Sequence, residues 1–240
     1  MTAPPGYLLL DLHNHTHRSY DASNTLADYA RAHTRGLFDV LAITDHNRID
    51  GALELAAAAA FPVVVGMEID TAEGELIGLF LERPIPYGLP ARETAERIRD
   101  QGGLVYLQHP FYRLVRMPLL PASRSELVDR GLVDVVEGRN GGPFTGVPDS
   151  RARAFAAEHG LPVGAGSDAH EPPDIGTCCV AVPPGPLTPA GVLAGLRAGI
   201  LVDRHRRSVA QIATKTRYRF VAEIPRRVRR EPRRLRRPPP

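Results

Sequence analysis

The chain has 240 residues, enough for one large or two small domains with a buried core. Its net charge of +3 joins two unlike parts: residues 1–203 carry 16 arginines and 25 acidic residues, net −9, and residues 204–240 carry 13 arginines, one lysine and two glutamates, net +12. The longest weakly polar run, residues 52–66, is shorter than the ~20 apolar residues of a membrane helix and the N-terminus lacks a secretory signal pattern, which excludes a spanning protein and predicts a cytoplasmic one.

Short apolar runs alternate with amphipathic or alanine-rich stretches along the acidic part of the chain. The apolar runs predict strands over Tyr7–Leu12, Val40–Thr44, Pro62–Ile69, Glu75–Leu81, Leu104–Leu107, Val133–Glu137, Pro162–Ala165 and Cys178–Val182. The stretches between them predict helices over Leu26–Arg35, Gly51–Ala60, Ala91–Gln101, Arg124–Arg130, Ser150–His159 and Pro189–Ala198. The strands are apolar on both faces, which is typical of a parallel sheet covered by helices. Such repeated units indicate an α/β fold, either a barrel or a doubly wound sheet.

Glycines follow five of the predicted helices, where a left-handed residue ends a helix. They are Gly36, Gly102, Gly131, Gly160 and Gly199. No GxGxxG motif follows the first strand and no GxxxxGK[ST] motif occurs, so the nucleotide-binding doubly wound folds have no support. The adjacent Cys178 and Cys179 are expected to be reduced packing residues in a strand.

Histidine and carboxylate side chains recur where successive predicted strands end. The strand ends run into Asp11-Leu12-His13-Asn14-His15, Thr44-Asp45-His46, Glu68, His109-Pro110, Glu137 with Asn140, and Ser167-Asp168-Ala169-His170. In a βα barrel, the C-terminal strand ends form the face where catalytic groups meet. His13 and His15, two apart on an extended segment, point to one side and can bind one metal ion. Imidazole and carboxylate ligands favour Zn, Mn or Fe.

Several segments resemble, in the same order, the motifs of the PHP (polymerase and histidinol phosphatase) superfamily. They are DLHNHTHRSYD, AITDHN, GMEID, LQHP, VEGRN and GSDAH. The resemblance runs from about residue 8 to residue 175. It implies a distorted (β/α)7 barrel that holds two or three divalent transition metals, and it implies hydrolysis of phosphate esters.

The resemblance also implies a set of metal ligands. It assigns His13, His15, Glu68 and Asp168 to the first ion, Glu68 and His109 to the second, and Asp21, His46 and His170 to the third. Several members with three metals have a histidine ligand of the second ion where this chain has Glu75. Glu75 is either a substitute ligand or a solvated carboxylate at the start of a strand. In the second case the cluster is binuclear, or its second site is weak.

The predicted reaction is attack on phosphorus by a metal-bound hydroxide, which forms near neutral pH because the metal lowers the pKa of water to ~7. Asp168 and His170 are the candidates for proton transfer. Arg113, Arg139 and Asn140 are the candidates for binding the substrate phosphate, although in so arginine-rich a chain each arginine is as readily a surface residue. The predicted substrate is a small phosphorylated metabolite, a nucleotide phosphate or a short oligonucleotide. The alternatives are hydrolysis of an amide or carboxylic ester, and a non-catalytic metal-stabilised scaffold with a nucleic-acid-binding tail.

The chain is predicted to divide into three parts. Residues 1–203 are the metal-dependent phosphoesterase domain, and residues 204–224 form a helix that packs on the barrel. Residues 225–240 are rich in arginine and proline and are predicted to be disordered. This tail either contacts RNA or another polyanion or serves only to keep the protein soluble.

Overall fold

The computed structural model describes residues 3–112, 117–142 and 146–204. The strands are β1 Leu8–Asp11, β2 Val40–Ile43, β3 Val63–Thr71, β4 Gly74–Leu79, β5 Leu104–Leu107, β6 Val135–Asn140, β7 Val163–Gly166, β8 Cys178–Val182 and β9 Ile200–Asp203. The helices are α1 Leu26–Thr34, α2 Asp50–Ala58, α3 Ala91–Arg99, α4 Pro121–Asp129, α5 Gly146–Glu158 and α6 Pro189–Arg197, with a short 3₁₀ helix at Pro172–Asp174. Contacts divide the chain into two units, Met1–Arg204 and His205–Pro240. The predicted C-terminal helix beyond Arg204 and the tail lie outside the described residues.

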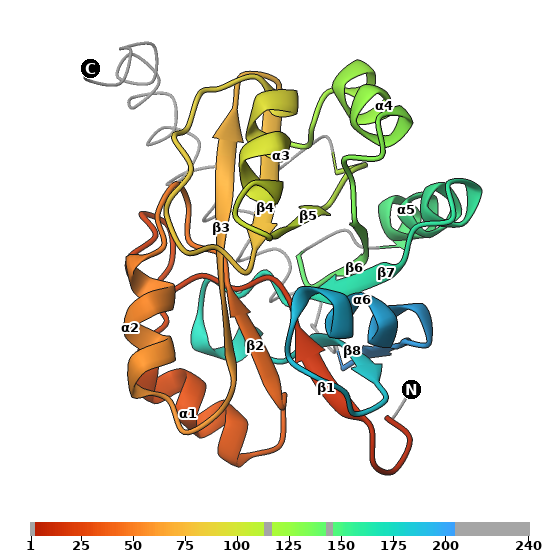
Figure 1. The fold of residues 1–240 in the computed structure, drawn as a ribbon. Coiled ribbons are helices and arrows are strands. Elements are labelled where there is room, and N and C mark those ends of the chain that lie inside the picture. The colour runs from red at the N-terminus through yellow and green to blue at the C-terminus, as the bar shows by residue number, and fades with distance from the viewer. Residues whose placement is uncertain (1–2, 113–116, 143–145, 205–240) are drawn as a thin grey trace. The chain divides into compact units, whose positions relative to one another are not determined.

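The nine strands form one sheet in the order β7-β6-β5-β4-β3-β2-β1-β8-β9, which curves into a nearly closed barrel (Figure 1). The gap between β7 and β1 is bridged beyond the strand ends: Leu12 N donates to Ala165 O at 3.0 Å, and Asp168 N donates to His13 O at 2.7 Å. Strands β1 to β7 therefore make the predicted seven-stranded barrel, and β8 and β9 extend the sheet on the other side of β1. This closure brings the ends of the first and seventh strands together.

The prediction of a parallel sheet is wrong for part of the sheet. Strand β4 is antiparallel to both β3 and β5, and β8 is antiparallel to β1. Only Ala72 and Glu73 separate β3 from β4, and such a short connection can form a hairpin but leaves no room for the crossover that a parallel pair needs. The hairpin carries Glu68 and Glu75 on the same wall of the barrel.

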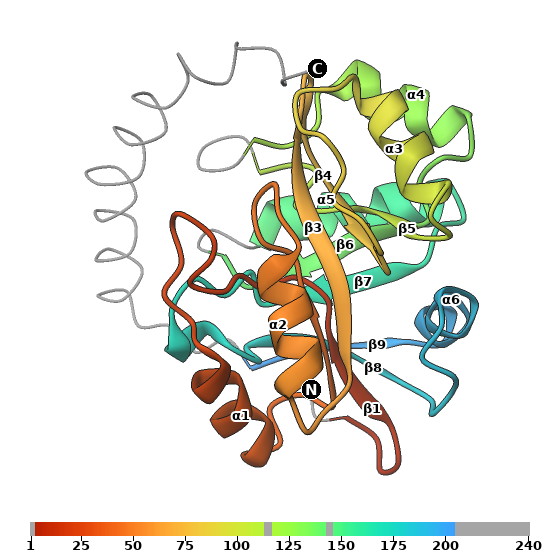
Figure 2. The same ribbon diagram turned by 60° about the vertical axis from the view of Figure 1, so that its left-hand side comes forward.

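Alternating side chains of the strands fill one inner core and two outer ones, which explains why the strands are apolar on both faces. The inner core contains Leu10, Leu12, Ala42, Val64, Ile77, Leu79, Tyr106, Val135, Ala165 and Val180. Their neighbours in sequence, such as Leu9 and Leu41, pack outward against α1 and α2, and α3 to α5 cover the β3–β6 side. Figure 2 shows these helices outside the sheet, with α1 beside α2 and α3 beside α4.

The helix ends follow local sequence signals. Thr25 and Asp28 form a capping box that starts α1, and Pro121 starts α4 three residues before the predicted Arg124. Gly36, Gly102, Gly131 and Gly160 have positive φ as predicted, but Gly199 does not; it joins α6 to β9, a strand that the sequence reading missed. Within the described ranges, no helix is long and apolar enough to cross a membrane.

The two cysteines are buried free thiols of β8, as predicted. Burial raises the pKa of both thiols. The side chains point to opposite faces of the strand: Cys178 Sγ lies 3.9 Å from Asp203 Oδ1, and Cys179 Sγ lies 3.5 Å from Leu37 O. They therefore act as packing residues.

Candidate metal centre

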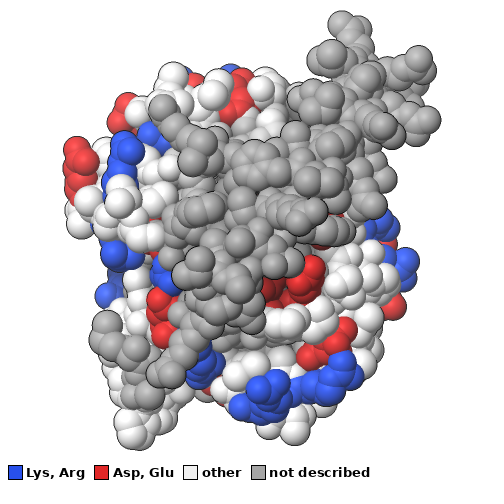
Figure 3. Space-filling view, turned by 180° about the vertical axis from the view of Figure 1, so that it is seen from behind, with Lys and Arg blue, Asp and Glu red and all other residues white. Residues whose placement is uncertain are grey.

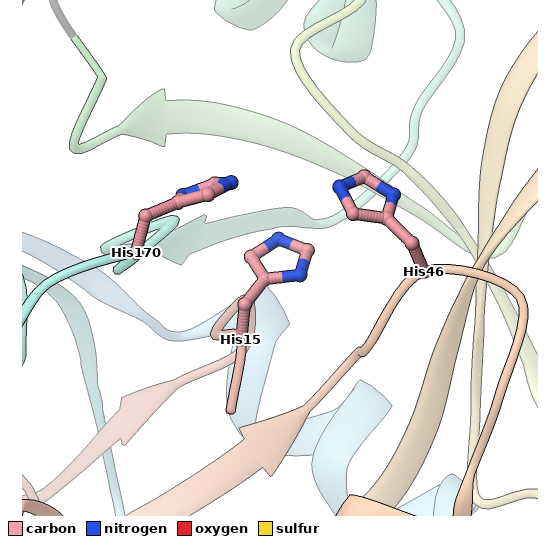
Figure 4. Close-up of side chains that lie close together, drawn as sticks. All are labelled: His15, His46 and His170. Carbon is pink, nitrogen blue, oxygen red and sulfur yellow. The ribbon is translucent and has the colours of Figure 1, made fainter. Parts of the chain in front are cut away.

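The strand ends deliver histidine and carboxylate side chains to one end of the barrel. His13 and His15 follow β1, His46 follows β2, and His170 follows β7. Figure 4 shows the rings of His15, His46 and His170 gathered from three different loops. The ring of His15 lies between the other two, with centroid distances of 4.7 Å to His46 and 4.5 Å to His170. The closure of the barrel thus unites residues that are far apart in sequence.

Four of the predicted ligands face one point. The Nε2 atoms of His13 and His15 lie 3.2 Å apart. His15 Nε2 is 3.3 Å from Glu68 Oε2 and 3.4 Å from Asp168 Oδ1, and His13 Nε2 is 3.5 and 3.7 Å from the same two oxygens. All four residues are buried. Two nitrogens and two carboxylate oxygens at such spacing form a donor set for a transition metal.

The carboxylate of Glu68 faces two groups of ligands at once. Its Oε2 atom points to His13 and His15, and also lies 3.3 Å from Nδ1 of His46. Its Oε1 atom lies 3.1 Å from Nε2 of His109 and accepts a hydrogen bond from Gln108 Nε2 at 3.3 Å. This arrangement suits a carboxylate that bridges two metal ions.

The residues predicted for a third ion also come together. Asp21 Oδ2 lies 3.4 Å from His46 Nε2 and 3.3 Å from His170 Nε2. Asp21 comes from the loop after His15, a segment that is held down because Asp45 accepts hydrogen bonds from Thr16 N and Thr16 Oγ1, both at 2.7 Å. Asp45 therefore positions the loop that carries Asp21, a role that its place in the Thr44-Asp45-His46 segment did not predict.

Glu75 is buried, so the alternative of a solvated carboxylate at the start of a strand is wrong. Its ligand atom groups with those of His46 and Asp70 within 4.8 Å, and not with the group of His13, Glu68 and His109. Glu75 and Asp70 are direct partners across the β3–β4 hairpin, which explains their proximity. Asp70 was not among the predicted ligands, although it lies two residues after Glu68 and therefore on the same face of β3.

The donor set fits divalent cations. Among the described residues, nine carboxylates are buried and no lysine or arginine is. Histidines are the basic neighbours that Glu68 and Asp168 face in the cluster. Among the described residues, Glu68 Oε2, both ring nitrogens of His46 and Nε2 of His170 form no hydrogen bond of regular geometry. Nitrogen or oxygen atoms of other cluster residues nevertheless lie within 3.5 Å of each of these atoms. Lone pairs that converge without hydrogen bonds are expected where metal ions bind.

The pKa values of His13 and His15 shift in opposite directions. Burial and the neighbouring His170 lower the pKa of His15 to about 3. Burial opposes a charge on His13 too, but three adjacent carboxylates, led by Asp168, outweigh it and raise the pKa of that ring well above its usual value. Burial also raises the pKa of Glu68, but the charges of His46 and His13 outweigh it and hold the pKa well below its usual range. The cluster therefore attracts positive charge, which divalent ions can supply.

Hydrogen bonds orient two of the rings so that Nε2 faces the cluster. Nδ1 of His170 donates to the carbonyl oxygen of Asp168 at 2.9 Å. Nδ1 of His15 donates to Ser19 Oγ at 3.3 Å, because the Ser19 hydroxyl itself donates to Asp45 Oδ1 at 2.8 Å. In each ring the protonated Nδ1 leaves the lone pair on Nε2, and such partners orient metal-binding histidines in proteins.

Two predicted ligands have strained backbones. His109 has φ 29° and Asp168 has φ 49°, values that residues other than glycine rarely adopt. The amide of His109 donates to Glu137 Oε2 at 2.7 Å, and the amide of Asp168 donates to the carbonyl of His13 at 2.7 Å. Strain of this kind persists only where surrounding contacts enforce it, and it concentrates at functional sites.

The predicted phosphate-binding residues have other partners in this structure, or lie outside it. Arg139 Nη1 lies 2.5 Å from Asp149 Oδ2, and Arg139 Nη2 lies 2.6 Å from Asp203 Oδ2. The amide nitrogen of Asn140 donates to Glu137 and Asp168, and its oxygen accepts from Gly142 N. Arg113 lies outside the described residues. Figure 3 shows basic and acidic side chains side by side on the surface. Arg18 pairs with Glu54, and Arg48 pairs with Asp50.

A methyl group at Gly166 is expected to damage the centre. A Cβ atom there would lie 2.2 Å from His13 Cβ and 2.9 Å from Glu137 Oε1, so Gly166→Ala must displace His13. We expect a loss of about 1–3 kcal/mol in the free energy of unfolding and zinc binding weakened by about 10-fold or more. Urea unfolding and a zinc titration measure the two effects.

Gly185→Ala is the matched control, because a Cβ at Gly185 meets no atom within 4 Å and its backbone does not have positive φ. This variant carries the same change in the unfolded chain and is expected to bind zinc as the unmodified protein does. Equal zinc affinity of both variants would show that His13 does not need its present position.

Comparisons with known proteins agree with this geometry. The sequence pattern of the PHP domain family matches residues 11–123, and that of a PHP-associated family matches residues 149–200. Two uncharacterised proteins of Methanocaldococcus jannaschii are similar: one is 51% identical over 76 residues (30% of this chain), the other 38% over 134 residues (55% of this chain). The chain matches 44% and 52% of their respective lengths, so it spans about half of these curated relatives.

Solved structures show the same fold at low sequence identity. A two-domain Bacteroides vulgatus protein that contains a predicted PHP-like metal-dependent phosphoesterase matches with a TM-score of 0.63 and 18% identity, over 85% of this chain and 68% of that one. A lesion-specific endonuclease, endonuclease Q of Pyrococcus furiosus, matches with a TM-score of 0.57 and 14% identity, over 81% of this chain and 57% of that one. Both likenesses support the barrel fold.

Proposed function

Because the chain belongs to the PHP domain family, we propose that it is a metal-dependent phosphoesterase that hydrolyses small phosphorylated substrates. The observation that carries the proposal is the position of Glu68. Its two carboxylate oxygens face two groups of histidines, His13 with His15 on one side and His109 on the other. The substrate is a small phosphorylated metabolite, a nucleotide phosphate or a short oligonucleotide, and the ions are zinc, manganese or iron.

The proposed ligands follow from the three groups of donor atoms. His13, His15, Glu68 and Asp168 would hold the first ion, Glu68 and His109 the second, and Asp21, His46 and His170 the third. Glu75 and Asp70 add two carboxylates beside His46. When bound, such ions supply Lewis acidity and lower the pKa of a coordinated water toward ~7. The burial of the donor atoms keeps bulk water from competing with these charges.

Asp168 and His170 are the proposed groups for proton transfer. The carbonyl oxygen of Asp168 holds Nδ1 of His170, so Nε2 is the atom of that ring that faces the cluster. The same lone pair would bind the third ion, so Nε2 can accept a proton only while it does not bind that ion. The carboxylate of Asp168 uses Oδ2 to accept from Asn140 Nδ2 at 3.1 Å, which leaves Oδ1 facing His13 and His15. Each group therefore presents one defined atom to the cluster.

Metal ions, and not an arginine clamp, are proposed to attract the phosphate. Residues 1–203 carry a net charge of −9, and the described arginines nearest the motifs are paired with carboxylates. Two or three divalent ions would reverse the local charge. Contact of residues 225–240 with RNA or another polyanion stays a prediction, since those residues lie outside the described ones.

A metal analysis combined with a substrate screen on one batch of protein tests the proposal. The screen contains phosphomonoesters, nucleotides, short oligonucleotides, amides and carboxylic esters, each with Zn, Mn or Fe. We expect about two or three bound ions per chain and turnover of phosphate esters only. Turnover confined to amides or carboxylic esters would assign the other hydrolysis, and bound metal without any turnover would favour the scaffold.

A further inference from the structure

Glu137 is a buried carboxylate beside the metal centre that none of the donor groups includes. It lies in β6 and accepts four hydrogen bonds. Oε1 accepts from His13 Nδ1 at 3.1 Å and from Tyr106 Oη at 3.3 Å, and Oε2 accepts from His109 N at 2.7 Å and from Asn140 Nδ2 at 2.9 Å. A carboxylate offers about four lone-pair sites. Glu137 therefore has no lone pair left for a metal ion and is not itself a ligand.

The bond to His13 decides which nitrogen of that ring carries the proton. An ionised carboxylate only accepts hydrogen bonds, so Nδ1 of His13 must be the donor. The lone pair of the neutral ring then lies on Nε2, the atom that faces His15 Nε2, Glu68 and Asp168. Carboxylates in this position orient metal-binding histidines and raise their basicity.

The other oxygen of Glu137, Oε2, contacts residues that follow β5 and end β6. It accepts from the amide of His109, whose φ of 29° is strained. It also accepts from Asn140, whose amide nitrogen donates to Asp168 Oδ2 as well. Glu137 thus bonds directly to two proposed ligands, His13 and His109, and reaches a third, Asp168, through Asn140. These ligands follow three different strands, β1, β5 and β7.

We propose that Glu137 is a positioning residue that orients His13, His109 and Asp168 for binding of the metal ions. The proposal rests on the metal centre of the proposed function and adds to it the residue that sets its geometry. Tyr106 extends the contact into the inner core of the barrel, because its ring belongs to that core and its hydroxyl reaches Glu137. The packing of the barrel interior therefore supports the geometry of the centre.

Glu137→Gln is the first test. A glutamine keeps the shape but replaces one acceptor oxygen with an NH2 donor, which in either orientation faces two donors of the protein. It opposes either His13 and Tyr106 or His109 and Asn140. We expect zinc to bind about 10–100-fold more weakly, measured by competition with a chromophoric chelator. Long-range ¹H–¹⁵N spectra of histidine-labelled, zinc-loaded protein are expected to lose or shift the Nδ1–H signal of His13.

Two further variants separate the effect of the position of the Glu137 carboxylate from the effect of its charge and from a general loss of stability. Glu137→Asp keeps the charge but withdraws the carboxylate by one methylene, so it cannot reach both His13 and His109, and zinc binding is expected to weaken here too. Asp134→Asn removes a carboxylate just before the same strand, where it accepts from Val105 N and Arg99. This control can lower stability but is expected to leave zinc affinity and the His13 signal unchanged.

The outcomes distinguish this proposal from the proposed function. If the unmodified protein binds zinc and both Glu137 variants, shown to be folded by circular dichroism, bind it equally well, the positioning role is wrong and the metal centre stands. If the unmodified protein binds no zinc, manganese or iron, the metal centre itself is wrong, and this proposal falls with it. Weaker binding in both variants with an intact Asp134→Asn control supports the positioning role.

Discussion

Replacing Glu68 with glutamine is expected to lower the turnover of phosphate esters by more than about 100-fold. Glutamine has nearly the same shape, but it offers one oxygen and one NH2 group where glutamate offers two oxygens. One side of the carboxylate faces His13 and His15 and the other faces His109. The variant therefore cannot bridge two ions, and it is expected to lose at least one of them.

Metal content by mass spectrometry and kcat/KM on the best phosphate ester of the screen measure this effect. Glu126→Gln is the matched control, because Glu126 is an exposed residue of α4 that pairs with Arg92 and Arg130 at the surface. It is expected to keep both metal content and turnover. Full metal occupancy together with unchanged turnover in Glu68→Gln would refute the bridging role and the proposed centre.

Removal of the metal ions is expected to lower the thermal midpoint of unfolding by about 8 °C or more. An ion present at 1,000 times its Kd stabilises the folded state by ~4 kcal/mol, and 1 kcal/mol corresponds to roughly 2–4 °C for a domain of this size. The physical reason is the charge of the site, where the buried carboxylates of Glu68, Asp70, Glu75 and Asp168 lie close together. Without divalent ions these carboxylates repel each other in an environment of low polarity.

Differential scanning calorimetry before and after chelation measures the shift. Protein treated with magnesium-saturated chelator controls for effects of the chelator itself, and added zinc or manganese is expected to restore the original midpoint. The Glu68→Gln variant is expected to show a smaller shift, because it holds fewer ions from the start. A midpoint that does not respond to chelation in a protein shown to lose its metal would mean that the buried carboxylates are neutralised in another way.

Local patterns in the sequence predicted most of the elements and the main donor set. All eight predicted strands and the six helices predicted before residue 204 are present, with shifts of a few residues at their ends. Apolar runs, capping residues and glycines act over a few neighbouring positions, and so they can be read without the fold. Polar residues at the ends of predicted strands, such as His13, His15 and Asp168, indicated the site because strand ends meet on one face of a barrel. The resemblance to the PHP superfamily, and not the strand pattern, implied which of these residues and which others are metal ligands.

Contacts between distant residues could be decided only by the tertiary structure. The burial of Glu75 follows from the β3–β4 hairpin and the loop before α4, and the pairing of Arg139 with Asp203 joins β6 to a strand that was not predicted. The role proposed for Glu137 depends on a bond to His13, 124 residues away in sequence. Residue type and spacing identify atoms that can bind a metal. Which atoms have a lone pair free, and which are held by a partner, depends on close packing between segments that the chain brings together only when it folds.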